Sequence, residues 1–158
     1  MSNYSEALAF AAAYCSSAER CKTEVLDKTA KFELESEEQT KLILRLQQEG
    51  FINEKRYISA FVNDRFKFNK WGKIKIRYML RQKGISSELI EEGLGLISED
   101  VYQEMLLTLL KLKRPTIKSK TQYELRGKML RYGTGKGFEP SLISQCLKKM
   151  DIEEDTDF

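Results

Sequence analysis

The chain has 158 residues, 41% hydrophobic and 32% charged, and its formal net charge is +3. That length suits one compact domain or a few small repeated units. The absence of histidine excludes Cys–His and Ser–His nucleophile systems, and with only three cysteines it argues against a disulfide framework or a four-ligand zinc site. We expect a cytoplasmic protein, because no apolar run is long enough for a membrane span and no basic segment predicts a signal peptide.

No residue pattern indicates an enzyme, a cofactor or a metal. Cys15, Cys21 and Cys146 are expected to be small apolar side chains in a reducing compartment. The stretch YGTGKGF lacks the spacing of a phosphate-binding loop, since Gly137 stands where Ser or Thr is required. The acidic residues lie in helix-forming runs that are typical of solvated faces.

Helix signals begin near the N-terminus and continue along the chain. Ser16 with Glu19, and Ser36 with Gln39, have the spacing of capping boxes, and Gly50 follows an apolar-periodic run as a C-terminal glycine does. These patterns predict helices over 5–15, 17–30 and 36–49.

The same signals predict six further helices and no sheet, because no segment alternates with a period of two. Gly84 ends one apolar-periodic run, Pro115 interrupts another, and Pro140 suits a first helical position. The expected segments are 54–69, 72–83, 87–97, 99–113, 119–134 and 140–150.

Two segments repeat at an offset of 53 residues without a gap. KGISSELIEEGL begins at Lys83 and KGFEPSLISQCL at Lys136, and a fainter copy starts near Leu34. Self-similarity at a period near 50 indicates stacked supersecondary units. We therefore predict an all-α fold of three tandem three-helix repeats in an elongated, curved molecule. The expected boundaries are 1–53, 54–98 and 99–150, followed by a flexible acidic tail at 151–158.

Charge is segregated along the chain. Residues 55–83 hold ten basic and one acidic residue, and 111–136 hold nine and one. The intervening 84–110 has six acidic residues and no basic one. Such clusters are typical of a polyanion partner, but they also fit charges that pair inside the fold. The acidic tail is either a solubilising terminus or a phosphate mimic that competes for the basic surface.

The segment KFNKWGKIKIRYMLRQKGI concentrates the basic charge. On a helix, Ile76, Met79 and Leu80 face the core, whereas Lys73, Arg77 and Arg81 form a ridge that repels itself unless a polyanion neutralises it.

The aromatic residues beside this ridge have two interpretations. Trp71 either packs between helices or offers a platform to a base or partner. Gly72 permits a special turn or close approach of the backbone to a phosphate at a helix N-terminus. The nearby aromatic residues are expected in the core, namely Tyr57, Phe61, Phe66 and Phe68.

The stretches EGFINEKRYISAFVNDRF and WGKIKIRYMLRQKGI resemble the RecX family, bacterial regulators of the RecA recombinase. YCSSAERCKTEVLDK looks like the first family repeat and KGFEPSLISQCLKK like the close of the third, so the resemblance covers about 5–150. The chain departs from the pattern at Gly133 and Gly135, where a regular helix is expected.

The resemblance implies a non-enzymatic protein that docks in the groove of the RecA–single-stranded DNA filament and inhibits strand exchange and ATP hydrolysis. It implies roles in DNA repair, recombination and the SOS response. The expected partners are RecA filaments and single-stranded or double-stranded DNA, with no membrane and a monomeric chain. By the resemblance, Lys73 and Arg65 are the residues expected to contact a partner. Structural roles are expected for Gly72, Ile74, Leu80 and Gly84. The family pattern also includes Arg56 and Lys83.

Together, the charge pattern and the resemblance give one set of candidate DNA- or RecA-binding residues. Arg126, Lys128 and Arg131 enter it because they occupy the corresponding basic positions of the next repeat. Two alternatives remain: a helix-turn-helix DNA-binding module that needs no RecA, and a structural adaptor whose charges pair internally. The candidates are Arg65, Lys67, Lys70, Trp71, Lys73, Lys75, Arg77, Arg81, Lys83, Arg126, Lys128 and Arg131.

Overall fold

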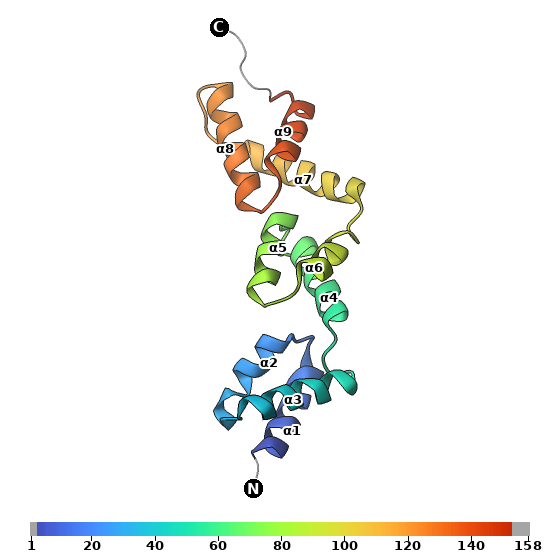
Figure 1. Cartoon of the computed structure of the whole chain (residues 1–158). Helices are drawn as coiled ribbons and strands as arrows, with labels where there is room; N and C mark the ends of the chain where they lie inside the picture. Colours follow the sequence, from blue (N-terminus) through green and yellow to red (C-terminus); the bar gives the residue numbers. More distant parts are fainter. Residues whose placement is uncertain (1–2, 153–158) are drawn as a thin grey trace. The chain divides into compact units, whose positions relative to one another are not determined.

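The computed structural model describes residues 3–152, and within them it contains nine α-helices, two short 3-10 segments and no strand. The all-helical prediction is confirmed, and each expected segment corresponds to one helix (Figure 1). Within the same range the helices are too short or too polar to span a membrane. The elements are α1 (Tyr4–Ser17), α2 (Lys22–Lys28), η1 (Ala30–Phe32), α3 (Ser36–Gln48), α4 (Glu54–Lys67), α5 (Lys73–Gln82), α6 (Ser87–Leu94), α7 (Glu99–Lys113), η2 (Arg114–Thr116), α8 (Gln122–Gly135) and α9 (Pro140–Lys149).

The start of α2 differs from the prediction. The Ala-rich helix α1 continues past the expected cap, and the Ser16 hydroxyl donates within it to the Ala12 carbonyl at 2.8 Å. The capping box of α2 instead begins at Cys21, whose backbone N–H donates to the Glu24 carboxylate at 3.0 Å. The second predicted box is also wrong, because Ser36 is already the first residue of α3.

Glycine and proline mark the other helix ends as predicted. Gly50 and Gly84 have left-handed backbones, with φ of 78° and 76°, which only glycine adopts at little cost. Pro140 opens α9, where its missing N–H has no helical partner to lose. Pro115 lies in η2, directly after α7 ends.

The chain forms two compact units. Unit 1 runs to Asn63 and adds Leu80–Gly93, and unit 2 combines Asp64–Met79 with the chain from Leu94 onward. The borders fall inside α4 and α5, so the middle predicted repeat contributes to both units. The three-repeat boundaries stay a prediction, and residues 153–158 of the predicted flexible tail lie outside the described residues.

Unit 1 has its core where α1, α2 and α3 meet (Figure 1). Ala11, Val25, Leu42 and Leu46 are fully buried there, and the small side chains of α1 let the other two helices approach closely. The free thiol of Cys15 is buried in the same cluster. Cys21 and Cys146 are also free and buried, and the Cys21 thiol contacts the Thr23 hydroxyl at 3.3 Å.

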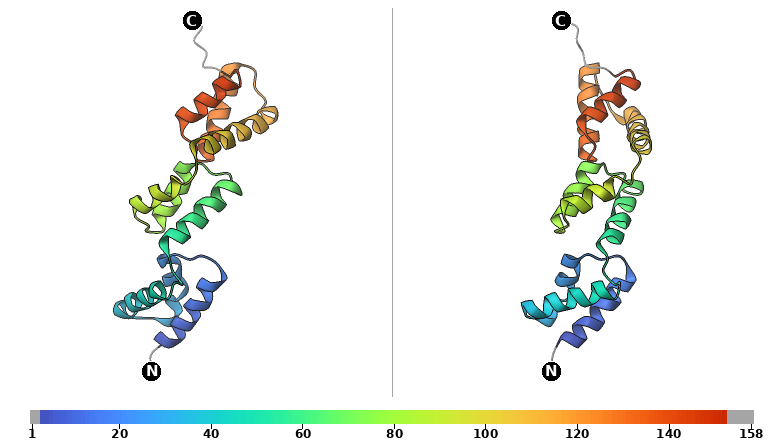
Figure 2. Two further views of the ribbon diagram at one scale, coloured as in Figure 1. Left: turned by 90° about the vertical axis from the view of Figure 1, so that its right-hand side faces the viewer. Right: turned by 45° about the vertical axis from the view of Figure 1, so that its right-hand side comes forward.

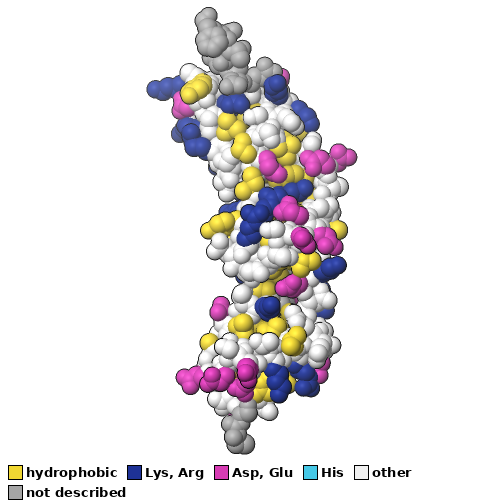
Figure 3. All heavy atoms as spheres, in the orientation of Figure 1, with side chains coloured by type: hydrophobic (Ala, Val, Ile, Leu, Met, Phe, Trp, Pro, Cys, Tyr) yellow, Lys and Arg dark blue, Asp and Glu magenta, His cyan; other side chains and the backbone are white. Residues whose placement is uncertain are grey.

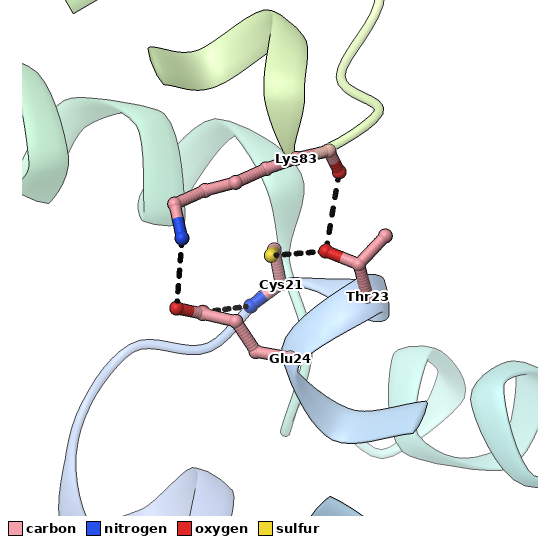
Figure 4. A network of polar contacts seen from close by, with 4 residues as sticks. All are labelled: Cys21, Thr23, Glu24 and Lys83. Atoms are coloured by element: carbon pink, nitrogen blue, oxygen red, sulfur yellow. Dashed lines mark hydrogen bonds and ion pairs between the residues drawn. The ribbon is translucent and has the colours of Figure 1, made fainter. Parts of the chain in front are cut away.

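A Lys-Gly turn joins α5 and α6 and packs onto α2 (Figure 4). The Thr23 hydroxyl donates to the Lys83 carbonyl at 3.3 Å, and the Lys83 ammonium donates to the Glu24 carboxylate at 3.2 Å. Burial raises the pKa of Glu24, but the Cys21 N–H and the Lys83 ammonium outweigh it and leave that pKa lowered. The half-buried Lys83 is therefore committed to an intramolecular ion pair.

Unit 2 has an aromatic core between α4, α7 and the α8–α9 turn. The Tyr102 ring lies 5.9 Å from the Phe66 ring and 5.1 Å from the Phe138 ring. The helices α7, α8 and α9 lie against one another, as the views of Figure 2 show. Gly133 permits this packing, because a Cβ there would lie 2.6 Å from Ile143 Cδ1. The glycine that departs from the family pattern thus has a packing role.

Candidate nucleic-acid interface

The turn between α4 and α5 carries the tryptophan and an unusual lysine. The Trp71 N–H donates to the Arg65 carbonyl at 2.9 Å, which closes the turn after α4 ends. Lys70 takes a left-handed backbone with φ of 58°, a conformation that costs a lysine about 1–2 kcal/mol. Its side chain is exposed. Its ammonium donates to the Lys67 carbonyl at 3.3 Å.

Cations surround the half-buried Trp71 side chain. The Lys75 ammonium lies 4.6 Å and the Arg65 guanidinium 5.4 Å from its ring centroid, both within cation–π range. From the α8–α9 turn, the Lys136 ammonium donates to the Asn69 carbonyl at 3.0 Å. We call Arg65, Lys70, Trp71, Lys75 and Lys136 the Trp71 cluster. Lys and Arg side chains gather over the region of α5 in the space-filling view (Figure 3).

The charges of this cluster repel one another. Burial lowers the pKa of Lys136, and the neighbouring charges of Lys75 and Lys70 lower it further. Among the described residues no carboxylate pairs with any of these three ammonium groups, and the sequence has no acid between Arg65 and Lys83. An anion placed here would relieve the repulsion, so the cluster is suited to bind phosphate.

The N-terminus of α5 is satisfied by the protein itself. The N–H of Gly72 donates to the Lys136 carbonyl at 2.7 Å, and that of Ile74 donates to the Gly137 carbonyl at 3.0 Å. The expected approach of Gly72 to a phosphate is therefore wrong, because these donors are occupied. Gly72 instead allows two backbones to meet, since a Cβ on it would lie 2.3 Å from the Gly137 carbonyl carbon.

A buried tyrosine, Tyr102, also accepts a backbone N–H at the N-terminus of α5 and so completes its helix cap. The Tyr102 hydroxyl accepts the N–H of Lys73 at 2.8 Å and donates to the Glu139 carboxylate at 2.5 Å. Burial, followed by the hydrogen bond to Glu139, raises the pKa of Tyr102, so the phenol stays protonated. This arrangement fixes α5 and the cations that it carries against α7 and α9.

The remaining candidates on α4 and α5 differ in exposure. Lys67 and Arg81 are exposed, whereas Arg77 is half-buried. The Lys73 ammonium lies 4.7 Å from the Tyr102 ring centroid. Of the predicted core face of α5, Ile76 and Leu80 are fully buried, whereas Met79 is only partly buried.

The second basic group does not reproduce the Trp71 cluster. The Arg126 guanidinium donates to the Ser144 hydroxyl at 3.2 Å, and the Lys128 ammonium pairs with the Glu124 carboxylate at 3.0 Å. Arg131 is exposed. Equivalent positions in the repeat thus carry different charge environments, because α8 has an acidic residue in its first turn and α5 has none.

Sequence reasoning did not include Lys136 among the candidate residues. A signal was present, since Lys136 aligns with Lys83 at the repeat offset. That offset now has a structural meaning: each lysine begins a turn whose glycine has a positive φ, and each turn packs onto a helix that precedes it in the chain. The repeat alone does not show that only Lys136 lies among other cations.

Replacing Lys70 with glycine is expected to stabilise the fold, by about 0.5–1 kcal/mol, because the left-handed backbone no longer carries a Cβ. The matched control is Lys111→Gly on the exposed side of α7, which is expected to destabilise by about 1 kcal/mol. Urea denaturation measures both variants. Equal destabilisation in the two would contradict a strained backbone at Lys70.

These features define a class: an all-helical protein with helices in groups of three and a cationic surface built on a rigid helix cap. Comparisons with known proteins narrow it. Residues 53–94 match the family model described as "RecX, second three-helix domain", which overlaps the predicted second repeat. A "Regulatory protein RecX" from Clostridium beijerinckii is 32% identical over 137 residues. These matches support the resemblance to the RecX family.

The extent of the match differs between relatives. The alignment covers 85% of this chain and 63% of the Clostridium beijerinckii protein. "Regulatory protein RecX" of Streptococcus agalactiae is 27% identical, and that alignment covers 90% of this chain and 54% of the Streptococcus protein. The chain thus spans about half to two thirds of the length of these curated relatives. The crystal structure of RecX from Lactobacillus salivarius superposes with a TM-score of 0.86 at 23% identity, covering 95% of this chain and 97% of that one, which establishes the fold.

Proposed function

We propose that this chain is a non-enzymatic regulator that binds the RecA–single-stranded DNA filament and inhibits RecA ATP hydrolysis, strand exchange and filament growth. The proposal rests on the similarity to proteins named "Regulatory protein RecX" and on the sequence resemblance to regulators of RecA. The observation that carries it in the structure is the Trp71 cluster, in which ammonium groups lie together without a carboxylate partner. In this role the chain acts in the cytoplasm, in DNA repair, recombination and the SOS response.

The cluster supports binding to DNA phosphates by simple electrostatics. Bringing a phosphate to three ammonium groups replaces repulsion by attraction and releases counterions from the DNA, which favours binding at low salt. The carbonyl of Gly137 and the hydroxyl of Tyr102 accept backbone N–H groups at the start of α5, so the backbone that carries Lys75 needs little ordering on binding. This role needs binding free energy and no catalytic residue.

Titrating the protein into single-stranded-DNA-dependent ATP hydrolysis by RecA tests the proposal. We expect inhibition at well below one molecule per RecA, as action on filament ends or on disassembly requires. The double variant Lys70→Gln/Lys75→Gln removes two phosphate contacts and should need about tenfold more protein for the same inhibition. Its salt dependence of DNA binding should also be shallower, by about 1.4 in the log–log slope for a single strand.

A charge-matched control separates the cluster from net charge. Lys22→Gln/Lys148→Gln also removes two exposed lysines and should inhibit like the parent protein. No effect of the parent protein at excess, while free DNA remains accessible, would reject the proposal and favour a DNA-binding module that acts without RecA.

A further inference from the structure

Three aromatic side chains stand out because folding leaves them exposed. Phe68 is 77% exposed, Tyr78 60% and Tyr123 77%. The prediction of Phe68 in the core is wrong: it lies two residues after the buried Phe66, about 200° away around the helix axis, and so falls outside the apolar face of α4. All three rings belong to unit 2, whereas no aromatic side chain of unit 1 is exposed within the described residues.

These rings also lack intramolecular partners. Within residues 3–152 none of the three stacks on another ring or lies under a cation, in contrast to Trp71. Ile74, 43% exposed, lies one helical turn before Tyr78 and extends its apolar surface. Rings exposed to this degree bury only part of their apolar surface on folding, so a ligand that covers the rest would gain the free energy of its burial.

Each ring has basic residues beside it in the chain. Phe68 lies between the exposed Lys67 and Lys70, and Tyr78 lies three residues before the exposed Arg81 on α5. Tyr123 comes three residues after the exposed Lys120. A planar apolar ring beside a cation complements a nucleotide, in which a flat base is attached to a phosphate.

We infer that Phe68, Tyr78 and Tyr123 are stacking platforms for unpaired bases, so that unit 2 recognises single-stranded DNA by its bases as well as by its phosphates. A duplex hides the faces of its bases, and only a single strand can present them. A protein partner fits less well, because an apolar protein contact needs one contiguous patch, and these rings sit on different elements. The inference deepens the proposed function and rests on its use of DNA.

The test compares two oligonucleotides of equal length and charge by fluorescence anisotropy, without RecA. One is oligo(dT); the other is an abasic strand with tetrahydrofuran at every position. One stacked base is worth about fivefold to hundredfold in affinity, so the parent protein should prefer oligo(dT) by at least about fivefold. The variant Phe68→Leu/Tyr78→Leu/Tyr123→Leu should bind both strands as the parent binds the abasic one.

The control is Leu112→Ala, which removes an exposed apolar side chain between Lys111 and Lys113 and should keep the preference. Equal affinity of the parent protein for both strands, binding to neither, or a preference retained by the folded triple variant would overturn the inference. A duplex of the same length adds a second arm: the parent should favour the single strand, and the triple variant should not.

RecA ATP hydrolysis distinguishes this inference from the proposed function. If the parent protein inhibits RecA but binds both strands equally, the regulator stands and base stacking fails. If it prefers oligo(dT) but leaves RecA unaffected, the stacking surface stands and the regulatory role fails. Helicity by circular dichroism confirms that the triple variant is folded; all three substitutions are at exposed positions.

Discussion

Gly72→Ala is expected to lower the free energy of unfolding of unit 2 by about 3 kcal/mol or more. A Cβ at this position would lie 2.3 Å from both the carbonyl carbon and the oxygen of Gly137, and 2.5 Å from the Phe138 nitrogen. These are backbone atoms, so no side-chain rotation can relieve the overlap. Moving the turn away would also break the hydrogen bonds that Lys136 and Gly137 accept from α5.

Gly135→Ala provides the control for this substitution. It lies in the last turn of α8, and a Cβ there would meet nothing within 4 Å. Because alanine favours helix, this variant should be neutral or up to about 1 kcal/mol more stable. Urea denaturation followed by circular dichroism measures both changes. A Gly72→Ala protein as stable as its Gly135→Ala counterpart would show that the two turns do not pack as closely as the structure has them.

The helices could be predicted because their signals are local. Pro140 opens a helix, and Gly50 and Gly84 end helices, through backbone preferences that depend on a few neighbouring residues. The inward face of α5 followed from spacing alone. The start of α2 was misplaced for the same reason, since a serine that could cap a helix is equally satisfied inside α1 by the Ala12 carbonyl.

The candidate site was predicted less completely because it depends on contacts distant in sequence. Lys136 joins the Trp71 cluster only because its turn packs on α5 through Gly72, and nothing local to either segment shows this. The repeat aligned Lys136 with Lys83, yet the two lysines meet different neighbours. Lys83 pairs with a carboxylate on α2, whereas Lys136 meets a helix without an acid in its first turn.

The two Lys-Gly turns explain how one motif serves structure and function. In both, the glycine supplies a positive φ and a lysine carbonyl accepts a hydrogen bond from the preceding helix region. The Lys83 ammonium is neutralised by the Glu24 carboxylate, so the role of that turn is to pack against α2. The Lys136 ammonium adds to the cations of the Trp71 cluster, so the second turn packs against α5 and also concentrates positive charge. The position of acidic residues on the partner helix decides between these outcomes.

Tyr102→Phe tests whether the contact between the α8–α9 turn and α5 holds the cationic surface in place. Removing the hydroxyl leaves two groups without their partner, the Lys73 N–H and the Glu139 carboxylate. Leaving a buried polar group unsatisfied costs about 1–3 kcal/mol, and both of these groups are only partly buried, so we expect a total loss of about 1–3 kcal/mol in the free energy of unfolding. The ring packing on Phe66 and Phe138 is kept, which isolates the hydroxyl as the cause.

The matched control is Tyr78→Phe, which removes a hydroxyl from an exposed ring and should leave stability unchanged. Denaturation in urea gives both values, and hydrogen exchange at the Lys73 amide reports the cap directly. That amide should exchange faster in Tyr102→Phe than in the parent protein, because its acceptor is gone. If its exchange and the stability both match those of the control, the hydroxyl does not cap α5. The cations of α5 would then be positioned by the Gly72–Gly137 contact alone.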